Sequence, residues 1–452
     1  MQKHALSIVQ RLRKHGHIAY FAGGCVRDML MKRSPKDWDI ATSAPPEIVL
    51  SLFKKTFEKG KAFGVISVLI QKKEYEVTTF RQEGKYSDGR HPDHVAWTND
   101  RQDALRRDFT INGMFYDPIQ KKFIDHVDGE KDLALKQIRA IGNPVHRFEE
   151  DKLRMIRAVR FATRFQFEIE PETKRAIHTL APKIHEVSVE RIRDELIKIL
   201  TEGPAHQGLK LLSEVGLLKE ILPEAEAMKG VAQPPEFHPE GDVWIHTLLA
   251  LSHLNHPNPE LAMGTLLHDI GKPPTFSIQE RIRFDGHVDV GAQMAKNICR
   301  RLRFSNDQIE HIASLVRQHL QFINVRKMRK STLKRFLMQE RFDDHLELHR
   351  VDCLACHQMM EQYEFCKEKL EALRQEPPLK KPLVSGKDLI RLGFKPGILF
   401  KEILHDVETA YLEGAIQNKR EGLKWVQHKF SSAMAEHSKP QHHKKKRPTQ
   451  RH

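Results

Sequence analysis

The sequence predicts an α+β chain in which a small mixed head is followed by an all-helical remainder. Short β-rich runs, such as residues 65–70 and 75–79, alternate with turn-rich stretches at the start of the chain. From Phe148 onward, apolar residues recur at three- and four-residue spacing, which is the period of an amphipathic helix. Proline-rich breaks near residues 234 and 378 divide this helical part. We therefore predict five segments, at residues 1–143, 144–232, 233–376, 377–432 and 433–452.

Length and composition indicate a folded protein that binds a polyanion. The chain of 452 residues is longer than a domain with a single hydrophobic core usually is. Its composition, with 39% hydrophobic and 30% charged residues, is ordinary for a globular protein. Lysine and arginine number 75 against 60 acidic residues, and the net charge of +15 favours nucleic acid as a partner. Five scattered cysteines do not suit a disulfide framework, and no apolar run is long enough for a membrane helix. We expect a cytoplasmic protein without membrane contact.

Each helical segment has a feature of its own. In residues 144–232, Ser188 precedes a charged helical run and predicts a helix start. Residues 233–376 form a body rich in histidine. The tail at residues 377–432 has a basic face beside a Gly-Pro turn, which suits either RNA phosphates or a structural hairpin. Residues 437–452 carry six Lys and Arg and no acid, so the last segment predicts a disordered basic arm.

Two motifs in the head predict a site for phosphate and metal. The string GGCVRD at residues 23–28 follows an apolar stretch, so backbone amides could approach a phosphate beside Arg27, although alone it is more often a tight turn. Asp37 and Asp39 would share one face of a strand and could both reach Mg²⁺. Divalent cations are what the attacking and leaving oxygens of a phosphoryl displacement need. Glu76 could offer a third carboxylate from a neighbouring strand, or be an exposed strand residue.

A third motif combines acidic and basic side chains on the first long helix. Asp151, Arg154, Arg157 and Arg160 step by three residues and predict one stripe along that helix. An aspartate accepts from an exocyclic amine and an arginine donates to ring atoms, so such a pair can read the edges of cytosine and adenine. The alternative is an exposed, salt-bridged face.

Together, these motifs resemble those of the class II tRNA nucleotidyltransferases, the CCA-adding enzymes of the polymerase β superfamily. The likeness runs from about Phe21 to Leu196 and includes, in order, GGCVRD, DWD at 37–39, FGV at 63–65, the loop at 81–95, RRD at 106–108, EDKLR at 150–154 and ERIR at 190–193. It implies a polymerase β-like nucleotidyltransferase head and a helical neck, acting on tRNA with CTP and ATP. It assigns Mg²⁺ binding to Asp37 and Asp39, phosphate binding to Gly24 and Arg27, sugar and phosphate binding to Arg107, base reading to Asp151 and Arg154, and the remaining nucleotide pocket to Arg157 and Arg160.

Three activities compete within that family. Poly(A) polymerases typically carry a Gly-Arg-Arg-Phe-like segment after the Asp-x-Asp strand, whereas this chain reads KGKAFGV at residues 59–65, which is closer to the tRNA enzymes. Enzymes that add only CC tend to lack a flexible loop, and the loop at residues 81–92 looks complete. We therefore favour addition of C, C and A, with addition of A alone still open. A rival interpretation is a catalytically silent head that only binds RNA.

The histidine-rich body contains a second constellation. His246, the adjacent His268 and Asp269, and the distant Asp352 offer mixed nitrogen and oxygen ligands that suit a divalent transition metal such as Mn, Ni or Co. The string HDIGK resembles a motif of the HD phosphohydrolase superfamily. This resemblance implies that the four residues are metal ligands and that the site hydrolyses a phosphomonoester or a cyclic phosphate. His287 and His319 lie where some members place extra ligands, or are surface residues.

One motif suggests a cofactor that we do not expect. Cys353, Cys356 and His357 match the string to which c-type haem is attached. Such attachment occurs in exported proteins, so we predict that the two cysteines serve helix packing and that no haem binds. The sequence leaves the oligomeric state open.

Overall fold

The computed structural model describes residues 1–60, 63–84, 94–236, 238–375 and 382–432. The chain divides into two compact units: residues 1–319 with 351–358, and residues 320–350 with 359–452. This division falls inside the segment 233–376 that the sequence predicts as one body. Residues 85–92 of the predicted loop at 81–92, residues 61–62 of the segment 59–65 and the basic arm lie outside the described residues.

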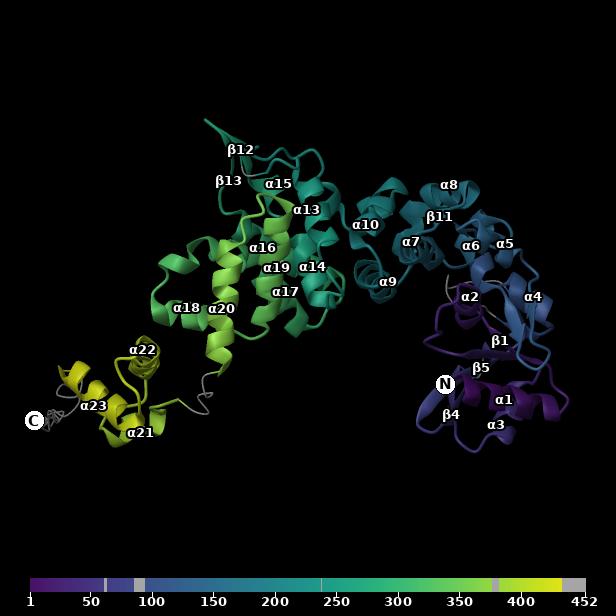
Figure 1. The fold of residues 1–452 in the computed structure, drawn as a ribbon, viewed down its shortest axis with the longest axis horizontal. Coiled ribbons are helices and arrows are strands. Elements are labelled where there is room, and N and C mark those ends of the chain that lie inside the picture. Colours follow the sequence, from purple (N-terminus) through teal and green to yellow (C-terminus); the bar gives the residue numbers. More distant parts are fainter. Residues whose placement is uncertain (61–62, 85–93, 237, 376–381, 433–452) are drawn as a thin grey trace, which may run out of the picture. The chain divides into compact units, whose positions relative to one another are not determined.

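The head of the first unit is built on a mixed sheet of seven described strands (Figure 1). The predicted runs at 65–70 and 75–79 are confirmed as strands, while β2 and β5 pair in parallel and the other neighbours pair antiparallel. The order is β3 (Thr56–Gly60), β4 (Val65–Ile70), β5 (Lys73–Thr79), β2 (Asp39–Thr42), β1 (Ala19–Ala22), β8 (Phe115–Asp117) and β9 (Lys122–Ile124).

Short helices and a strand pair complete the head. Helix α1 (Gln2–Lys14) buries Ala5, Ile8, Val9 and Leu12, whose spacing forms one apolar stripe against the sheet. The other elements are α2 (Gly24–Leu30), α3 (Pro46–Leu52), the pair β6 (Arg81–Glu83) and β7 (Val95–Trp97), α4 (Asp100–Leu105), the 3₁₀ turn Thr110–Asn112, α5 (Gly129–Ala134) and β10 (Gln137–Ile138).

The neck is helical, as predicted, because its apolar residues follow the helical period. Helix α7 (Leu153–Phe165) buries the apolar residues that recur at three- and four-residue spacing, which are Leu153, Ile156, Val159, Phe161 and Phe165. Ser188 is the N-cap residue of α9 (Val189–Thr201). One correction concerns strands: β11 (Glu168–Ile169) pairs with β10, so strands do not end near residue 143. The other neck helices are α6 (Pro144–Glu150), α8 (Pro171–Leu180), the 3₁₀ stretch Ala181–Glu186, α10 (Ala205–Glu214), α11 (Leu217–Ile221) and α12 (Pro223–Glu226).

The rest of the first unit carries the histidine-rich helices. Helix α14 (Pro259–Leu267) is buried along most of its length, from Leu261 to Leu267, which places the residues that follow it deep in the unit. A single hydrophobic core extends from Phe109 through the neck to Val316. The remaining elements are α13 (Val243–Ser252), α15 (Lys272–Thr275), the hairpin β12 (Phe276–Ile278) and β13 (Ile282–Phe284), α16 (His287–Arg301) and α17 (Asn306–Gln318).

The second unit has two small cores of its own. One contains Phe322, Phe336 and Leu370, and the other contains Leu389, Ile403 and Val426. The chain from residue 319 onward forms the 3₁₀ stretch His319–Lys327, α18 (Lys330–Leu337), α19 (Phe342–Ala355), whose last turn belongs to the first unit, α20 (Glu361–Gln375), α21 (Gly386–Arg391), α22 (Ile398–Glu413) and α23 (Lys419–Lys429).

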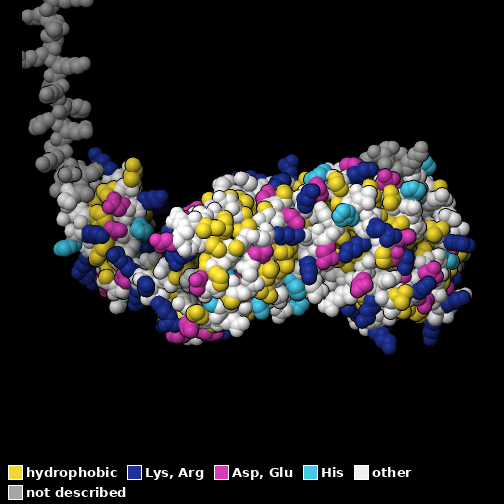
Figure 2. All heavy atoms as spheres, turned by 90° about the horizontal axis from the view of Figure 1, so that it is seen from above, with side chains coloured by type: hydrophobic (Ala, Val, Ile, Leu, Met, Phe, Trp, Pro, Cys, Tyr) yellow, Lys and Arg dark blue, Asp and Glu magenta, His cyan; other side chains and the backbone are white. Residues whose placement is uncertain are grey.

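Two observations concern the surface. None of the helices among the described residues is both long and apolar enough to cross a bilayer. On the face drawn in Figure 2, Lys and Arg side chains are interspersed with Asp and Glu. The basic side chains on that face are therefore mixed with acidic ones rather than gathered in one patch.

Candidate active sites

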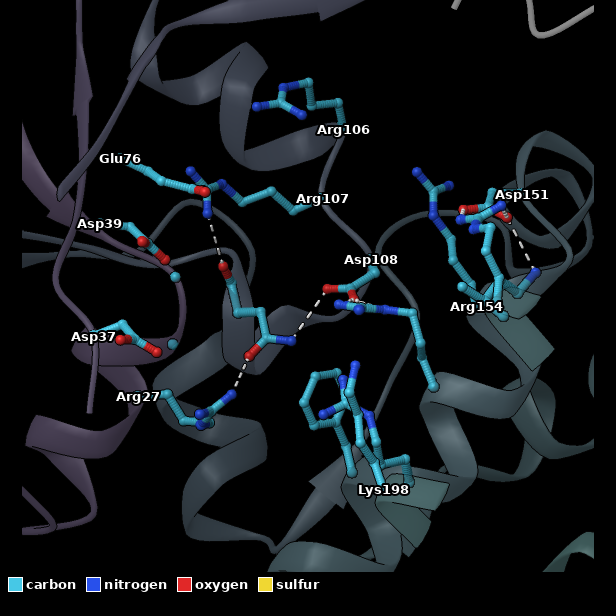
Figure 3. Close-up of a pocket in the computed structure, with 18 of the residues that line it drawn as sticks. Arg27, Asp37, Asp39, Glu76, Arg106, Arg107, Asp108, Asp151, Arg154 and Lys198 are labelled. Atoms are coloured by element: carbon cyan, nitrogen blue, oxygen red, sulfur yellow. Dashed lines mark hydrogen bonds and ion pairs between the residues drawn. The ribbon is translucent and has the colours of Figure 1, made fainter. Parts of the chain in front are cut away.

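A cavity of about 1000 Å³ opens between the head sheet and the neck helices. It is strongly charged: among the described residues, nine arginines and lysines and six carboxylates line it. All ten residues predicted for the head site line this cavity. Figure 3 shows the labelled ones among them, with Asp37, Asp39 and Glu76 on one side and Asp151 and Arg154 on the other. The ten residues are Gly24, Arg27, Asp37, Asp39, Glu76, Arg107, Asp151, Arg154, Arg157 and Arg160.

The glycine turn shapes one wall of the cavity. Gly23 has φ +69°, a conformation that favours glycine, and it begins helix α2 at Gly24. A Cβ at Gly23 would lie 3.0 Å from a guanidinium nitrogen of Arg107, so a larger residue would crowd that side chain. Arg27 is buried, 2.8 Å from Asp28 and within 2.6 Å of the Asn112 side-chain oxygen. The turn therefore places Arg27 at the cavity wall and leaves room for Arg107 beside it.

Three carboxylates face this wall. The parallel register pairs Ile40 with Val77, and so it brings Asp39 and Glu76 to adjacent strand positions. Asp37 lies before β2, so the prediction that both aspartates share a strand face is wrong; the turn leading into the strand holds Asp37 at the cavity instead. Burial, reinforced by Glu76, raises the pKa of Asp39 to about 6, although Arg107 opposes the shift. Crowded oxygen donors that resist ionisation together fit a divalent cation such as Mg²⁺.

Two contacts hold the Arg107 side chain in place. Its guanidinium pairs with the buried Asp103 at 3.0 Å and donates to the Asn112 carbonyl at 3.4 Å. Burial alone would raise the pKa of Asp103, but Arg107 and Arg106 outweigh it and hold that pKa below its usual value. Arg107 is thus a fixed cation beside the three carboxylates.

A partly buried ion pair joins the head to the neck. Arg157 on α7 donates to Asp108 Oδ2 from Nη2 at 2.6 Å and from Nε at 3.0 Å, and Asn112 donates to Asp108 Oδ1 at 3.1 Å. Burial works against ionisation of Asp108, yet Arg157 and the hydrogen bonds lower its pKa to about 2. The sequence motifs did not reveal the roles of Asp108 and Asn112, although Asp108 belongs to the string RRD at residues 106–108.

This ion pair gives a pH-dependent stability. The pKa of Asp108 falls from an ordinary 3.8 to about 2 on folding, so its contribution is present above pH 4 and is lost as the pH falls from about 4 to 2. Asp108→Asn should therefore cost about 2 kcal/mol at pH 7, and less as the pH approaches 3. Thermal unfolding across this pH range measures the difference. Asp194→Asn, at an exposed surface pair, is the control and should cost little; an equal cost for Asp108→Asn at pH 7 and pH 3 would contradict the assignment.

The predicted base-reading pair lies at the junction of α6 and α7. Asp151 precedes α7, which begins at Leu153, so the predicted stripe on one helix holds for the three arginines but not for Asp151. Asp151 pairs with Arg191 of α9 at 2.8 Å, and Arg154 pairs with Glu150 at 2.7 Å. The two side chains are thereby oriented at the cavity (Figure 3). Arg191 stands in the quoted string ERIR, but a motif alone does not reveal this contact.

A second cluster lies among the histidine-rich helices of the same unit. His246 Nε2 lies 3.0 Å from Asp352 Oδ1 and 3.2 Å from His268 Nε2. His268 Nε2 lies 3.3 Å from Asp269 Oδ2, and three of these four predicted ligands are fully buried. Cys353, next to Asp352, is buried, and the Cys356 thiol donates to the Asp352 carbonyl at 3.1 Å, consistent with roles in packing. The structure thus brings together all four residues predicted for this site.

The other oxygen of Asp269 faces a second group of ligands. Asp269 Oδ1 lies 3.8 Å from His287 Nε2 and 3.7 Å from His319 Nε2. Neither Asp269 Oδ1 nor His287 Nε2, both buried, has a hydrogen-bond partner among the described residues. Buried polar atoms are rarely left without a partner, so these orphaned atoms fit a bound cation. Both histidines are buried, which disfavours the surface alternative for them.

Backbone contacts fix the tautomers of three of these histidines. The Nδ1 atoms of His268, His287 and His319 lie 2.7–2.8 Å from backbone carbonyls, which can only accept. Each Nδ1 therefore carries a proton, which leaves the Nε2 of each ring as the atom that can bind a metal within the cluster. Burial lowers the pKa of His319 to about 4, which keeps that ring neutral. Neutral imidazoles with carboxylates are a ligand set for divalent transition metals.

Comparison with known families agrees with the architecture. Residues 19–139 match the family model of the poly(A) polymerase head domain, and residues 166–229 match that of the RNA and SrmB-binding site of polymerase A. Residues 286–426 match the model of tRNA nucleotidyltransferase domain 2. The sheet, the charged cavity and these matches define a nucleotidyltransferase with a polymerase-type head.

Individual relatives identify the family of nucleotidyltransferases more closely. The CCA-adding enzyme of Enterococcus faecalis is 32% identical over 431 residues, covering 93% of this chain and 94% of that enzyme. That of Lactobacillus johnsonii is 40% identical over 260 residues, which span 56% of this chain and only 65% of that enzyme. The crystal structure of the Bacillus stearothermophilus CCA-adding enzyme in complex with CTP has a TM-score of 0.74 at 28% identity, covering 96% of this chain and 98% of that one. The chain belongs to the family of CCA-adding enzymes.

Proposed function

We propose that the chain adds C, C and A to the 3′ end of tRNA, using CTP and ATP and releasing pyrophosphate. The observation that carries this proposal is the arrangement of charged residues in the cavity. Three carboxylates and Arg107 line one side of it, and Asp151 and Arg154 line the other. Relatives that align over almost the whole chain support it. A silent RNA-binding head would not need crowded carboxylates beside a fixed arginine.

The cavity residues divide the work of the reaction. Mg²⁺ bound by Asp37 and Asp39, with Glu76 beside them, would neutralise charge on the attacking 3′ oxygen and on the departing pyrophosphate. Arg107 and Arg27 lie beside these carboxylates, where they can hold the triphosphate in line for attack. The ion pair with Asp103 already orients the Arg107 side chain. Substrate binding therefore costs little further conformational entropy in this side chain.

Asp151 and Arg154 are suited to choosing the base. Cytosine and adenine each present an exocyclic amine, whereas uracil and guanine present a carbonyl at the corresponding position. The Asp151 carboxylate accepts from Arg191 and from the Leu153 backbone N–H, and a carboxylate has about four acceptor positions, so it can still accept an amine. Arg154 can donate to the neighbouring ring atoms, and Arg157 and Arg160 border the same space.

Replacing Arg154 tests this division. Arg154→Ala should reduce the preference for CTP and ATP over UTP and GTP by about 10-fold or more, because one member of the reading pair is gone. It should change the apparent affinity for the triphosphate less, since the phosphate contacts remain. Arg164→Ala, one turn past Arg160 on α7 and outside the cavity, is the control. Equal selectivity in Arg154→Ala and the parent would contradict the base-reading role.

The activity itself has a direct test. Purified protein is incubated with tRNA lacking its terminal CCA and with labelled CTP alone, ATP alone, or both. Addition of two C residues from CTP alone and of a final A only when both are present supports the proposal. Products that stop at CC, that require a tRNA already ending in CC, or that carry a long A tract would instead identify a CC-adding enzyme, an A-adding enzyme or a poly(A) polymerase.

We further propose that the histidine cluster is an HD-type phosphohydrolase site that processes phosphates at RNA 3′ ends. The observation that favours it is the pair of ligand groups that share Asp269, namely His246, His268 and Asp352 on one side and His287 and His319 on the other. A divalent transition metal such as Mn, Ni or Co would supply an activated water at neutral pH. The chain contributes a buried site in which backbone carbonyls fix the tautomers of His268, His287 and His319.

A further inference from the structure

The β12–β13 hairpin has one apolar face. Its register pairs Phe276 with Phe284 and Ile278 with Ile282. Side chains alternate along a strand, so these four lie on one face and Arg283 lies on the other. The ring centroids of Phe276 and Phe284 are 5.9 Å apart. Two aromatic rings and two isoleucines thus form a continuous surface.

Much of this face is open to solvent. Ile278 is 70% exposed and Phe276 is 38% exposed, and Figure 1 shows the hairpin extending away from the helices around it. Single exposed apolar residues are common, but an aligned row on a projecting hairpin more often marks a binding surface.

The face begins at the histidine cluster. The Phe284 ring centroid lies 5.4 Å from the Lys272 ammonium and 6.4 Å from the His287 ring, and the Phe284 carbonyl fixes the His287 tautomer. Lys272 is buried, and its ammonium lies 2.7 Å from Asp269 Oδ2. An occupant of the face would therefore place one end beside a cation and the proposed metal ligands.

We propose that this face is a shelf on which the terminal nucleoside of an RNA 3′ end stacks while its phosphate binds at the histidine cluster. The chemistry at the two ends selects this occupant: a cation held by the cluster, together with Lys272, would suit an anion, and the rings suit a flat base, as aromatic side chains do in other sites for single-stranded nucleic acid. A peptide helix could cover the apolar face but would bring no phosphate. The inference rests on the proposed phosphohydrolase site and names what that site recognises.

Binding can be measured apart from hydrolysis. The probe is a short RNA that ends in 2-aminopurine with a 3′ methylenephosphonate, which resembles the phosphate but resists hydrolysis; a matched RNA lacks the terminal base. Full-length protein is compared with Phe276→Ala and Ile278→Ser, and with Ile398→Ser, a 94% exposed isoleucine elsewhere, as the control. We expect the parent and the control to bind the base-bearing RNA about 10-fold more tightly than the abasic RNA, and both hairpin variants to lose most of that ratio.

Several results would overturn the shelf. The same ratio in the parent and in both hairpin variants excludes stacking on this face. Equal competition by free adenosine 3′-monophosphate would assign the face to mononucleotides rather than to an RNA end. A parent that is dimeric by light scattering, with a monomeric Ile278→Ser, would identify a second copy of the chain as the occupant.

The shelf and the hydrolase can fail separately. Release of phosphate from an RNA 3′-phosphate is measured in parallel with the binding assay. Hydrolysis that depends on His268 but not on the hairpin, together with unchanged binding, refutes the shelf and retains the hydrolase. Binding that depends on the hairpin without any hydrolysis supports the shelf and refutes the hydrolase.

Discussion

Replacing Asp39 by asparagine should reduce nucleotide addition to tRNA by about 1,000-fold or more, while CTP still binds. Asp39 is the most buried of the three carboxylates, and burial together with Glu76 makes its charge costly unless a cation is present. Removing that charge should remove most of the stabilisation that Mg²⁺ gives the reaction, which amounts to several kcal/mol. The triphosphate contacts of Arg107 and Arg27 remain. Single-turnover incorporation of labelled CTP measures the rate of nucleotide addition, and equilibrium binding measures the affinity of the variant for CTP.

The control for this variant is Glu47→Gln, which removes an exposed carboxylate from the first turn of α3 in the same head. It should leave the rate within about twofold of the parent, because such surface charges contribute little. An Asp39→Asn protein that adds nucleotides as fast as the parent would show that the carboxylates do not hold the catalytic metal.

Replacing His268 by alanine should abolish hydrolysis at RNA 3′ ends and leave nucleotide addition unchanged. His268 Nε2 lies beside both His246 and Asp269, and its tautomer is fixed by the Thr265 carbonyl, so the alanine substitution removes a nitrogen that is held in position within the cluster. We expect a loss of at least about 100-fold in phosphate release, with lower metal content after purification in Mn²⁺. Metal analysis by mass spectrometry and a phosphate-release assay give the two readouts.

His253→Ala is the matched control, because His253 lies at the exposed end of α13, away from the ligands. It should retain both metal and hydrolysis. Phosphate release that persists in His268→Ala would reject the ligand set. Loss of nucleotide addition in the same variant would instead mean that the change had disturbed the shared core.

Local patterns in the sequence predicted much of the fold. The spacing of Leu153, Ile156 and Val159 predicted α7 because a buried helix face has to repeat with the helical period. The short strands β11, β12 and β13 were missed, since two or three residues are too few to show an alternating pattern. Asp37 was misplaced for a related reason: the strand begins at Asp39, and strand ends are poorly marked in sequence.

The site residues were predicted where a motif carries them and missed where only tertiary contacts do. Asp39 and Glu76 are far apart in sequence, and the parallel pairing of β2 with β5 makes them neighbours. The partners that orient the predicted residues, such as Arg191 for Asp151 and Asp103 for Arg107, depend on packing that no local pattern encodes. The position of Asp269 between two groups of histidines likewise appears only in three dimensions.

The central claim is that Asp37 and Asp39 bind the metal while Asp151 and Arg154 judge the base within one cavity. A crystal structure of the protein with CTP and Mg²⁺ tests it most directly. We predict the triphosphate beside Asp37, Asp39 and Arg107, with the cytosine amine within hydrogen-bonding distance of Asp151 and a ring acceptor facing Arg154. A cytosine ring bound away from Asp151 and Arg154 would contradict the account.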